Sequence, residues 1–221
     1  MRVLTPELLD SLAADDPRAI RSRRDLVLIN AVMRQSAIMA RALSACSRPS
    51  SIADLGGGDG RFALGVARRL AKRWPGVQVL IVDQQDIVTA ETRAGFEALG
   101  WHCEVRRGDV FEVLPATDII TANLFLHHFD DTALSRLLDA VAARTPCFVA
   151  CEPRRNRFAL VASHLVGLLG CNAVTRHDAV TSVEAGFAGQ ELSRLWPQKG
   201  WRLTERSGFP FTHVFTAHRD V

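Results

Sequence analysis

At 221 residues, the chain is too long for a mini-protein that depends on disulfides or metal, and it is short for two catalytic domains. Hydrophobic residues make up 48% and charged residues 23%, a balance that excludes a largely disordered chain. The net charge of +3 lies entirely in residues 1–48, which hold eight arginines and five acidic residues. So small and local an excess disfavours a broad nucleic-acid-binding surface.

No segment is long and apolar enough to cross a bilayer, which takes about 20 residues. The most apolar stretch, 158–170, is thirteen residues long and contains His164. The first sixteen residues include four acidic side chains and lack the apolar core of a signal peptide. We therefore expect a cytoplasmic protein without membrane insertion.

The five cysteines lack the spacing of a zinc site, because no Cys-x-x-Cys pair occurs and their number is odd. In a chain without a secretory signal, this indicates reduced, buried thiols and no metal centre. Cys147 and Cys151 would lie along one face of a predicted strand.

Helical patterns occupy the first quarter of the chain. A short helix is predicted over Pro6–Ala14, and a longer helix over 18–45, where apolar residues recur at steps of three and four. The apolar face of the longer helix is wide enough to cover a pocket as well as a core. We therefore expect residues 1–48 to form a helical cap, which could also pack across a homodimer.

From residue 49 onward, short apolar runs alternate with helical stretches, the pattern of a parallel sheet with helices on both faces. Only Phe209-Pro210-Phe211 separates the last two strands, so they must be antiparallel. Residues 49–221 thus predict an α/β fold with a Rossmann-like, doubly wound, mostly parallel seven-stranded sheet, an antiparallel final strand and a helical insertion at about 157–196. The predicted strands are 51–55, 77–83, 103–107, 118–123, 147–152, 202–208 and 212–217, and the predicted helices are 62–73, 88–99, 131–144, 157–169 and 189–195.

The loop after the first strand is the expected ligand site, because ligands bind beyond the carboxyl ends of the strands in such sheets. Residues 54–60 read Asp-Leu-Gly-Gly-Gly-Asp-Gly and lead into a helix. Glycines permit positive φ and keep side chains away from a ligand, while the helix N-terminus attracts a negative group. A dinucleotide fingerprint needs its third glycine at position 61, where Arg61 stands, so a nicotinamide-dependent oxidoreductase is disfavoured.

The order Asp-x-Gly-x-Gly-x-Gly resembles the cofactor loop of class I S-adenosylmethionine-dependent methyltransferases, and the chain as a whole looks like those that act on small molecules. Three later segments are also similar to that family: Val79–Asp83 in the second strand, Arg107–Phe111 after the third, and Asn123–Asp131 after the fourth. Together the four segments cover residues 51–131, and the antiparallel hairpin is similar to the family's final strands.

The resemblance implies S-adenosylmethionine as the cofactor and S-adenosylhomocysteine as the product. It implies that Asp83 accepts the ribose hydroxyls with Gln84 beside it, and that Asp109 and Val110 bind the adenine. A turn aspartate is the alternative interpretation of Asp109. The remaining cofactor residues implied by the resemblance are Asp54, Gly56, Gly58 and Gly60 at the methionine end and Asn123 below the methyl group.

His127 and His128 are the candidate catalytic bases. A hydroxyl acceptor needs a proton acceptor with a pKa near neutrality, and both histidines follow the strand that ends near the expected methyl position. If their segment is extended, the two rings point to opposite sides. A structural role for both residues stays open, and His164 and His177 in the insertion are further candidates.

The predicted function is S-adenosylmethionine-dependent methyl transfer to a small phenolic or lipid-like acceptor, with transfer to oxygen favoured over transfer to carbon. Asn123 is followed by Leu124-Phe125 and not by the Pro-Pro-aromatic motif of enzymes that methylate nitrogen on nucleic acid or protein. Two alternatives remain. One is a non-catalytic binding or regulatory protein with this fold, and the other is an RNA methyltransferase whose N-terminal arginines contact phosphates.

Overall fold

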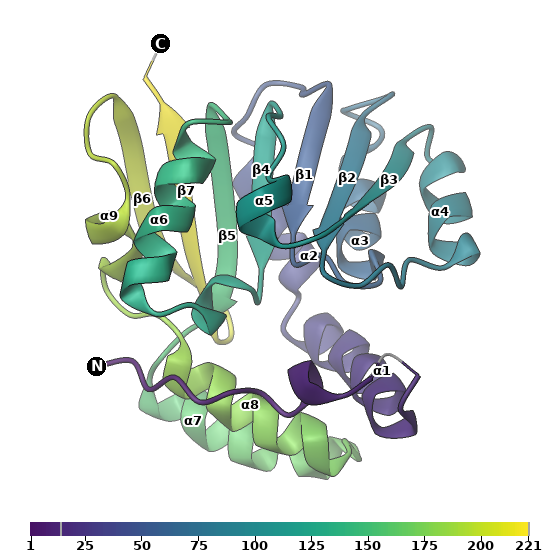
Figure 1. The fold of residues 1–221 in the computed structure, drawn as a ribbon, viewed down its shortest axis with the longest axis vertical. Helices are drawn as coiled ribbons and strands as arrows, with labels where there is room; N and C mark the ends of the chain where they lie inside the picture. Colours follow the sequence, from purple (N-terminus) through teal and green to yellow (C-terminus); the bar gives the residue numbers. More distant parts are fainter. Residues whose placement is uncertain (14, 221) are drawn as a thin grey trace.

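A computed structural model, which describes residues 1–13 and 15–220, contains a seven-stranded sheet in the order β3-β2-β1-β4-β5-β7-β6 (Figure 1). The pairs within β1–β5 are parallel, and β7 runs antiparallel to both β5 and β6. The predicted fold class, including the antiparallel final strand, is therefore confirmed. The strands are β1 (Ser51–Leu55), β2 (Gln78–Asp83), β3 (His102–Arg107), β4 (Ile119–Asn123), β5 (Cys147–Pro153), β6 (Trp201–Gly208) and β7 (Thr212–Arg219).

The burial of each strand follows its place in the sheet. Every residue of β5 is buried, because helices cover both faces of the sheet at its centre, and the strand accordingly reads as a nearly continuous apolar run. The edge strand β6 instead places exposed residues at Arg202, Thr204 and Arg206. Strand β6 could be recognised from its alternation of exposed and partly buried residues, and β5 from its continuous apolar run.

Polar caps begin several of the helices. Asp130, Asn156 and Asn172 each accept a backbone N–H from the third residue that follows, at the starts of α6, α7 and α8. The helices are α1 (Pro17–Val32), α2 (Gln35–Leu43), α3 (Arg61–Leu70), α4 (Ala90–Glu97), α5 (Val110–Val113), α6 (Asp131–Ala142), α7 (Arg157–His164), α8 (Ala173–Ala185) and α9 (Glu191–Leu195), with 3₁₀ turns η1 (Leu9–Ser11), η2 (Leu126–His128) and η3 (Leu165–Leu169).

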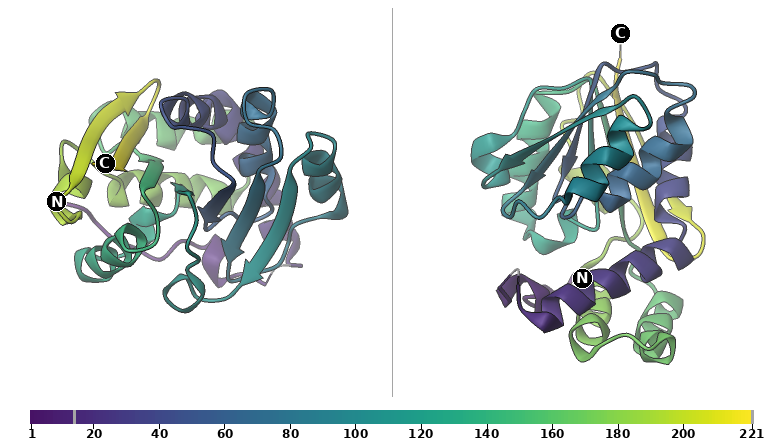
Figure 2. Two further views of the ribbon diagram at one scale, coloured as in Figure 1. Left: turned by 90° about the horizontal axis from the view of Figure 1, so that it is seen from above. Right: turned by 90° about the vertical axis from the view of Figure 1, so that its right-hand side faces the viewer.

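Two apolar layers hold the helices on the sheet. One layer joins α2 and α3 to one face through residues such as Met39, Leu43 and Val149, and the other joins α6 and α9 to the opposite face through Leu137 and Phe148. Beyond the carboxyl ends of the parallel strands, α1, α7 and α8 form a cap, visible as purple and green helices below the sheet (Figures 1 and 2). The insertion expected at about 157–196 contains α7, η3, α8 and α9.

The N-terminal quarter differs from the prediction in two ways. The helix expected over Pro6–Ala14 is wrong, since only η1 forms there and the backbone N–H groups of Leu8 and Leu9 bond to Asp178 instead; position 14 lies outside the described residues. The long helix expected over 18–45 is divided at Arg34, whose φ of 55° is left-handed. The apolar period continues through this break, so the sequence did not reveal it.

The break separates two packing environments within the expected 1–48 cap. Helix α1 contacts α8, whereas α2 packs on α3 and β5 with Met39 and Leu43 fully buried. Among the described residues, no single helix is long and apolar enough to span a membrane; α1 and α2 meet that criterion only together, across a bend of 58°.

Leu137→Ala is expected to lower the free energy of unfolding by about 3 kcal/mol, because Leu137 on α6 is fully buried and its loss leaves a cavity. Urea denaturation measures the change. The matched control is Leu168→Ala on η3, where the side chain is 83% exposed, and it should change the free energy by less than about 0.5 kcal/mol. Equal effects of the two substitutions would contradict the described core.

Candidate active site

A cavity of about 750 Å³ opens at the carboxyl ends of β1–β4, between the sheet and α1. This is the edge at which doubly wound sheets bind ligands, and the volume is within the usual range for small-molecule sites. Ten of the eleven residues predicted for the site line it: Asp54, Gly56, Gly58, Asp83, Gln84, Asp109, Val110, Asn123, His127 and His128. Gly60 does not line the cavity, and instead precedes α3 with its N–H bonded to the carbonyl of Gly57 at 3.0 Å.

The glycine loop adopts a conformation that depends on glycine at three positions. Gly56, Gly58 and Gly60 have φ of 65°, 55° and 73°, which other L-residues rarely adopt. A Cβ at Gly56 would lie 2.2 Å from the ring of Phe125, so the loop approaches the segment after β4 closely. At Gly58 a Cβ would meet nothing within 4 Å, so the backbone there is accessible to a ligand.

Asp83, the last residue of β2, holds this loop in place. Its Oδ2 accepts the N–H of Gly58 at 2.9 Å, and its Oδ1 accepts the N–H of Gln85 at 2.9 Å. Each carboxylate oxygen has a second lone pair, so Asp83 can accept two further hydrogen bonds from a ligand. The carboxylate is thus oriented before any ligand binds.

Asp54 lies under the loop and is only 2% exposed. Burial raises the pKa of its carboxyl to about 7; a hydrogen bond from the Thr121 hydroxyl opposes this rise, and the nearby charge of Asp83 adds to it. The Thr121 bond, at 2.7 Å to Oδ1, joins β1 to β4 beneath the cavity.

Asp109, which follows β3, and Asn123, the last residue of β4, also line the cavity. Asp109 caps α5 by accepting the N–H of Phe111 at 2.9 Å, so it is a turn aspartate as well as a cavity residue. Asn123 ends β4, and its side-chain oxygen is buried without a hydrogen-bond partner among the described residues. Such an atom is costly to leave unpaired, so it marks a position where a ligand donor would be favourable.

His127 is buried between two carboxylates. Its Nδ1 lies 2.8 Å from Oε2 of Glu152 and its Nε2 lies 3.3 Å from Oε1 of Glu7. Burial by itself lowers the pKa of His127, but the hydrogen bonds to Glu152 and Glu7 outweigh it and raise the pKa to about 9. The ring is therefore an imidazolium at neutral pH while Glu7 is in place.

His128 is more accessible than His127, and its Nδ1 lies 3.4 Å from Oδ2 of Asp10. The two rings lie side by side, with centroids 4.3 Å apart and planes inclined by 32°. Their segment is the 3₁₀ turn η2 and not an extended strand, so the expectation of opposite orientations does not apply. His164 and His177, the further candidates, do not line the cavity.

Sequence reasoning missed the carboxylates of Glu7 and Glu152. Glu152 is completely buried near the end of β5, and its Oε1 accepts the N–H groups of Phe125 and Leu126 at 3.0 and 2.9 Å. An acidic residue at the carboxyl end of an apolar strand is a signal that could have identified it. No local signal marks Glu7, which reaches His127 from 120 positions earlier in the chain.

Arg2 fixes the N-terminal segment that carries Glu7. Its guanidinium bonds to the carbonyls of Ala185 and Phe129 at 2.8 and 2.9 Å and to Asp131 at 2.9 Å. It also lies 4.3 Å from the ring centroid of Phe187. Glu7 additionally accepts a hydrogen bond from Ser182 on α8, so the segment links the cap to His127.

A family model described as "O-methyltransferase domain" matches residues 13–149, more than half of the chain. The chain belongs to the O-methyltransferase family. The match covers the glycine loop, the ends of β2–β4 and both histidines of η2.

Comparisons with individual proteins agree with this assignment. Strychnine O-methyltransferase from Strychnos nux-vomica is 32% identical over 89 residues, which are 40% of this chain and 22% of that enzyme. An O-methyltransferase family protein from Burkholderia thailandensis matches with a TM-score of 0.61 at 18% identity, over 95% of this chain and 64% of that one. The plantazolicin methyltransferase BamL, solved with SAH, matches with a TM-score of 0.67 at 13% identity, over 96% and 93%.

The chain thus spans less than two thirds of the Burkholderia protein, and its aligned part is less than a quarter of the strychnine enzyme. At these identities, the two structural matches establish a shared fold.

His127 is expected to contribute about 3 kcal/mol to the fall in the free energy of unfolding as the pH rises from 6.5 through 9. The pKa of this group is higher in the folded protein than in the unfolded chain, so the folded state binds more protons in that interval. Its stabilising contribution is complete below the unfolded pKa and is lost above the folded one. Urea unfolding at pH 6.5 and 9.5 measures the difference.

The control for this prediction is His102→Gln, an exposed histidine that should leave the pH dependence unchanged. In His127→Gln the fall should be smaller by about 3 kcal/mol than in the wild type, because Asp54 and the buried thiols still contribute to it. Equal falls in the wild type and in His127→Gln would contradict the ion pairs of His127.

Proposed function

We propose that this chain catalyses S-adenosylmethionine-dependent methyl transfer to a hydroxyl group of a small acceptor. One observation carries the proposal: the glycine loop, Asp83 and His127 line the same cavity, and Glu152 holds His127 from behind through Nδ1. Family membership supports the transfer to oxygen, and SAH bound to the structurally similar BamL supports the cofactor.

The residues of the cavity fit this cofactor. The open backbone at Gly58 permits close approach of the methionine end, and the unpaired oxygen of Asn123 is available to an ammonium donor. The spare lone pairs of Asp83 suit a ribose diol. Asp109 and Val110 are proposed to bind the adenine, with Gln84 beside the ribose.

When bound, S-adenosylmethionine supplies an electrophilic methyl group on sulfur. The chain must then align the acceptor oxygen, exclude water and take up the hydroxyl proton. We propose Nε2 of His127 as the proton acceptor, since Glu152 holds the ring through Nδ1 and leaves Nε2 on the cavity side. In this structure Oε1 of Glu7 lies 3.3 Å from Nε2 of His127, so the hydroxyl of the acceptor must take the place of the Glu7 carboxylate.

The acceptor side of the cavity is apolar. Leu26 and Val27 of α1 line the cavity together with Phe125 and Phe129, whose rings pack edge to face at 5.1 Å. Apolar walls favour an aromatic or lipid-like molecule with few polar groups. We therefore propose a phenolic or lipid-like acceptor.

Isothermal titration should detect micromolar binding of S-adenosylmethionine and S-adenosylhomocysteine, about −8 kcal/mol, and no binding of NAD. Asp83→Ala should weaken both by about 100-fold, because it removes the ribose acceptor and the bond that holds Gly58. Asp86→Ala, an exposed neighbour paired with Arg93, is the matched control and should bind normally. Normal affinity in a folded Asp83→Ala variant would refute the site assignment.

The pH dependence of kcat/KM tests the role of His127. Release of S-adenosylhomocysteine in the presence of a panel of phenols should rise with pH up to about 9, because only neutral His127 can accept a proton. Glu7→Gln should move this rise to lower pH by about one unit, since a negative neighbour that favours the charged ring is removed. Glu112→Gln, on the exposed side of α5, should not move it.

Two substitutions separate the histidines in the same assay. His127→Asn should abolish turnover while His128→Asn retains it. The reverse result would make His128 the base. Cofactor binding without product release from any acceptor would instead favour the non-catalytic alternative.

A further inference from the structure

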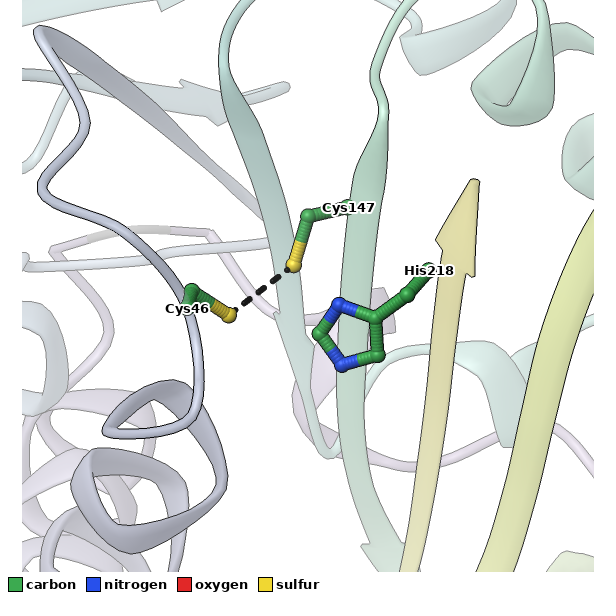
Figure 3. A group of neighbouring side chains, drawn as sticks. All are labelled: Cys46, Cys147 and His218. Carbon is green, nitrogen blue, oxygen red and sulfur yellow. Dashed lines mark hydrogen bonds between the residues drawn. The ribbon is translucent and has the colours of Figure 1, made fainter. Parts of the chain in front are cut away.

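A second cluster of reactive side chains lies at the opposite edge of the sheet from the cavity. Cys46 follows α2, Cys147 begins β5, and His218 lies near the end of β7 (Figure 3). Because the cavity is at the carboxyl ends of the parallel strands, the start of β5 is remote from it. The cluster therefore has no part in the proposed methyl transfer.

The sheet register itself brings two of these residues together. Cys147 and His218 are direct partners across the antiparallel pair β5–β7, so their side chains project from the same face. That face carries α2, and the turn that follows α2 places Cys46 over the pair, with its N–H bonded to the carbonyl of Leu43 at 2.9 Å. Three distant parts of the chain thus meet at one point.

The geometry suits a single metal ion. The two sulfur atoms are 3.3 Å apart, and one ligand atom from each of the three residues lies within 4.8 Å of the others. Tetrahedral zinc, with bonds of about 2.3 Å to sulfur, separates two thiolates by about 3.8 Å. Small side-chain rotations therefore convert the observed arrangement into a coordination shell.

We propose that Cys46, Cys147 and His218 form a zinc site, with a solvent molecule as the fourth ligand. On binding, each thiol releases its proton to solvent and its sulfur bonds to Zn²⁺, while the neutral imidazole of His218 donates a nitrogen lone pair. Two thiolates balance the charge of the ion, which a partly buried site requires. Cys46 and His218 are each half-buried, so solvent can reach the fourth position.

The third ligand distinguishes this site from a thiol pair that simply forms a disulfide. A disulfide between Cys46 and Cys147 needs no imidazole, yet Figure 3 shows the ring of His218 directed at the two sulfurs. Thiolate and imidazole are also the ligand types that zinc prefers. The ion would join the turn after α2 to the neighbouring strands β5 and β7, so its role would be structural.

The test uses the full-length protein, reduced and stripped of metal with a chelator. Equilibrium dialysis against ZnCl₂ should give one ion per chain, and CoCl₂ should produce the absorption of cobalt bound to thiolate. Saturating zinc should raise Tm by about 5 °C or more. Cys46→Ser and His218→Gln should weaken zinc binding by about 100-fold. Cys171→Ser, a buried thiol in the insertion, is the matched control and should bind normally.

Each alternative outcome overturns the proposal. Absence of zinc binding by the folded, reduced protein would leave Cys46 and Cys147 as a thiol pair. Zinc binding that persists in both Cys46→Ser and His218→Gln would place the ion elsewhere; among residues 1–13 and 15–220, Glu7, His127 and His128 form the other group close enough to share an ion. Cobalt binding without the thiolate absorption would also exclude the two sulfurs as ligands.

Discussion

The active-site edge depends on the buried carboxylate of Glu152. This side chain accepts two backbone N–H groups from the turn after β4 and pairs with Nδ1 of His127. An unpaired charge at this depth would be strongly destabilising, so all of these bonds must form together. The turn follows Leu124 in a left-handed conformation, at a φ of 52°, and the bonds to Glu152 compensate for the strain.

The bonds to Glu152 determine the positions of Phe125 and His127. Once Glu152 holds the amide of Phe125, the Phe125 ring lies against Gly56, where any side chain would collide with it. The glycine loop and the turn after β4 are therefore fitted to each other through direct contact. Asp83 then secures the other side of the same loop through the N–H of Gly58.

The two ends of the sheet carry different chemistry. At the carboxyl edge, acidic side chains, glycines and histidines surround a cavity that the cap covers. At the opposite edge, the antiparallel pairing of β5 with β7 places a thiol and an imidazole side by side. The antiparallel final strand, which distinguishes this sheet from a fully parallel one, thus creates the second cluster as a consequence of its direction.

The sequence alone determined the strands, their mainly parallel direction, the antiparallel hairpin and most of the predicted residues that line the cavity. Each of these depends on a signal within a short window: an apolar run, a glycine at a turn, or an acidic residue at a strand end. Because the carboxyl ends of parallel strands meet at one edge, such local signals also place Asp54, Asp83 and Asn123 together.

Only the tertiary structure decided the division of the N-terminal helix, the environment of His127 and the Cys46–Cys147–His218 cluster. The apolar period is the same on both sides of Arg34, and the helix breaks there because α1 packs on α8 in the cap while α2 packs on α3 and β5. Glu7 and His127 are 120 positions apart, and Cys46 and Cys147 are 101 apart. Contacts at that separation depend on how complete elements pack, and no local pattern of residues encodes them.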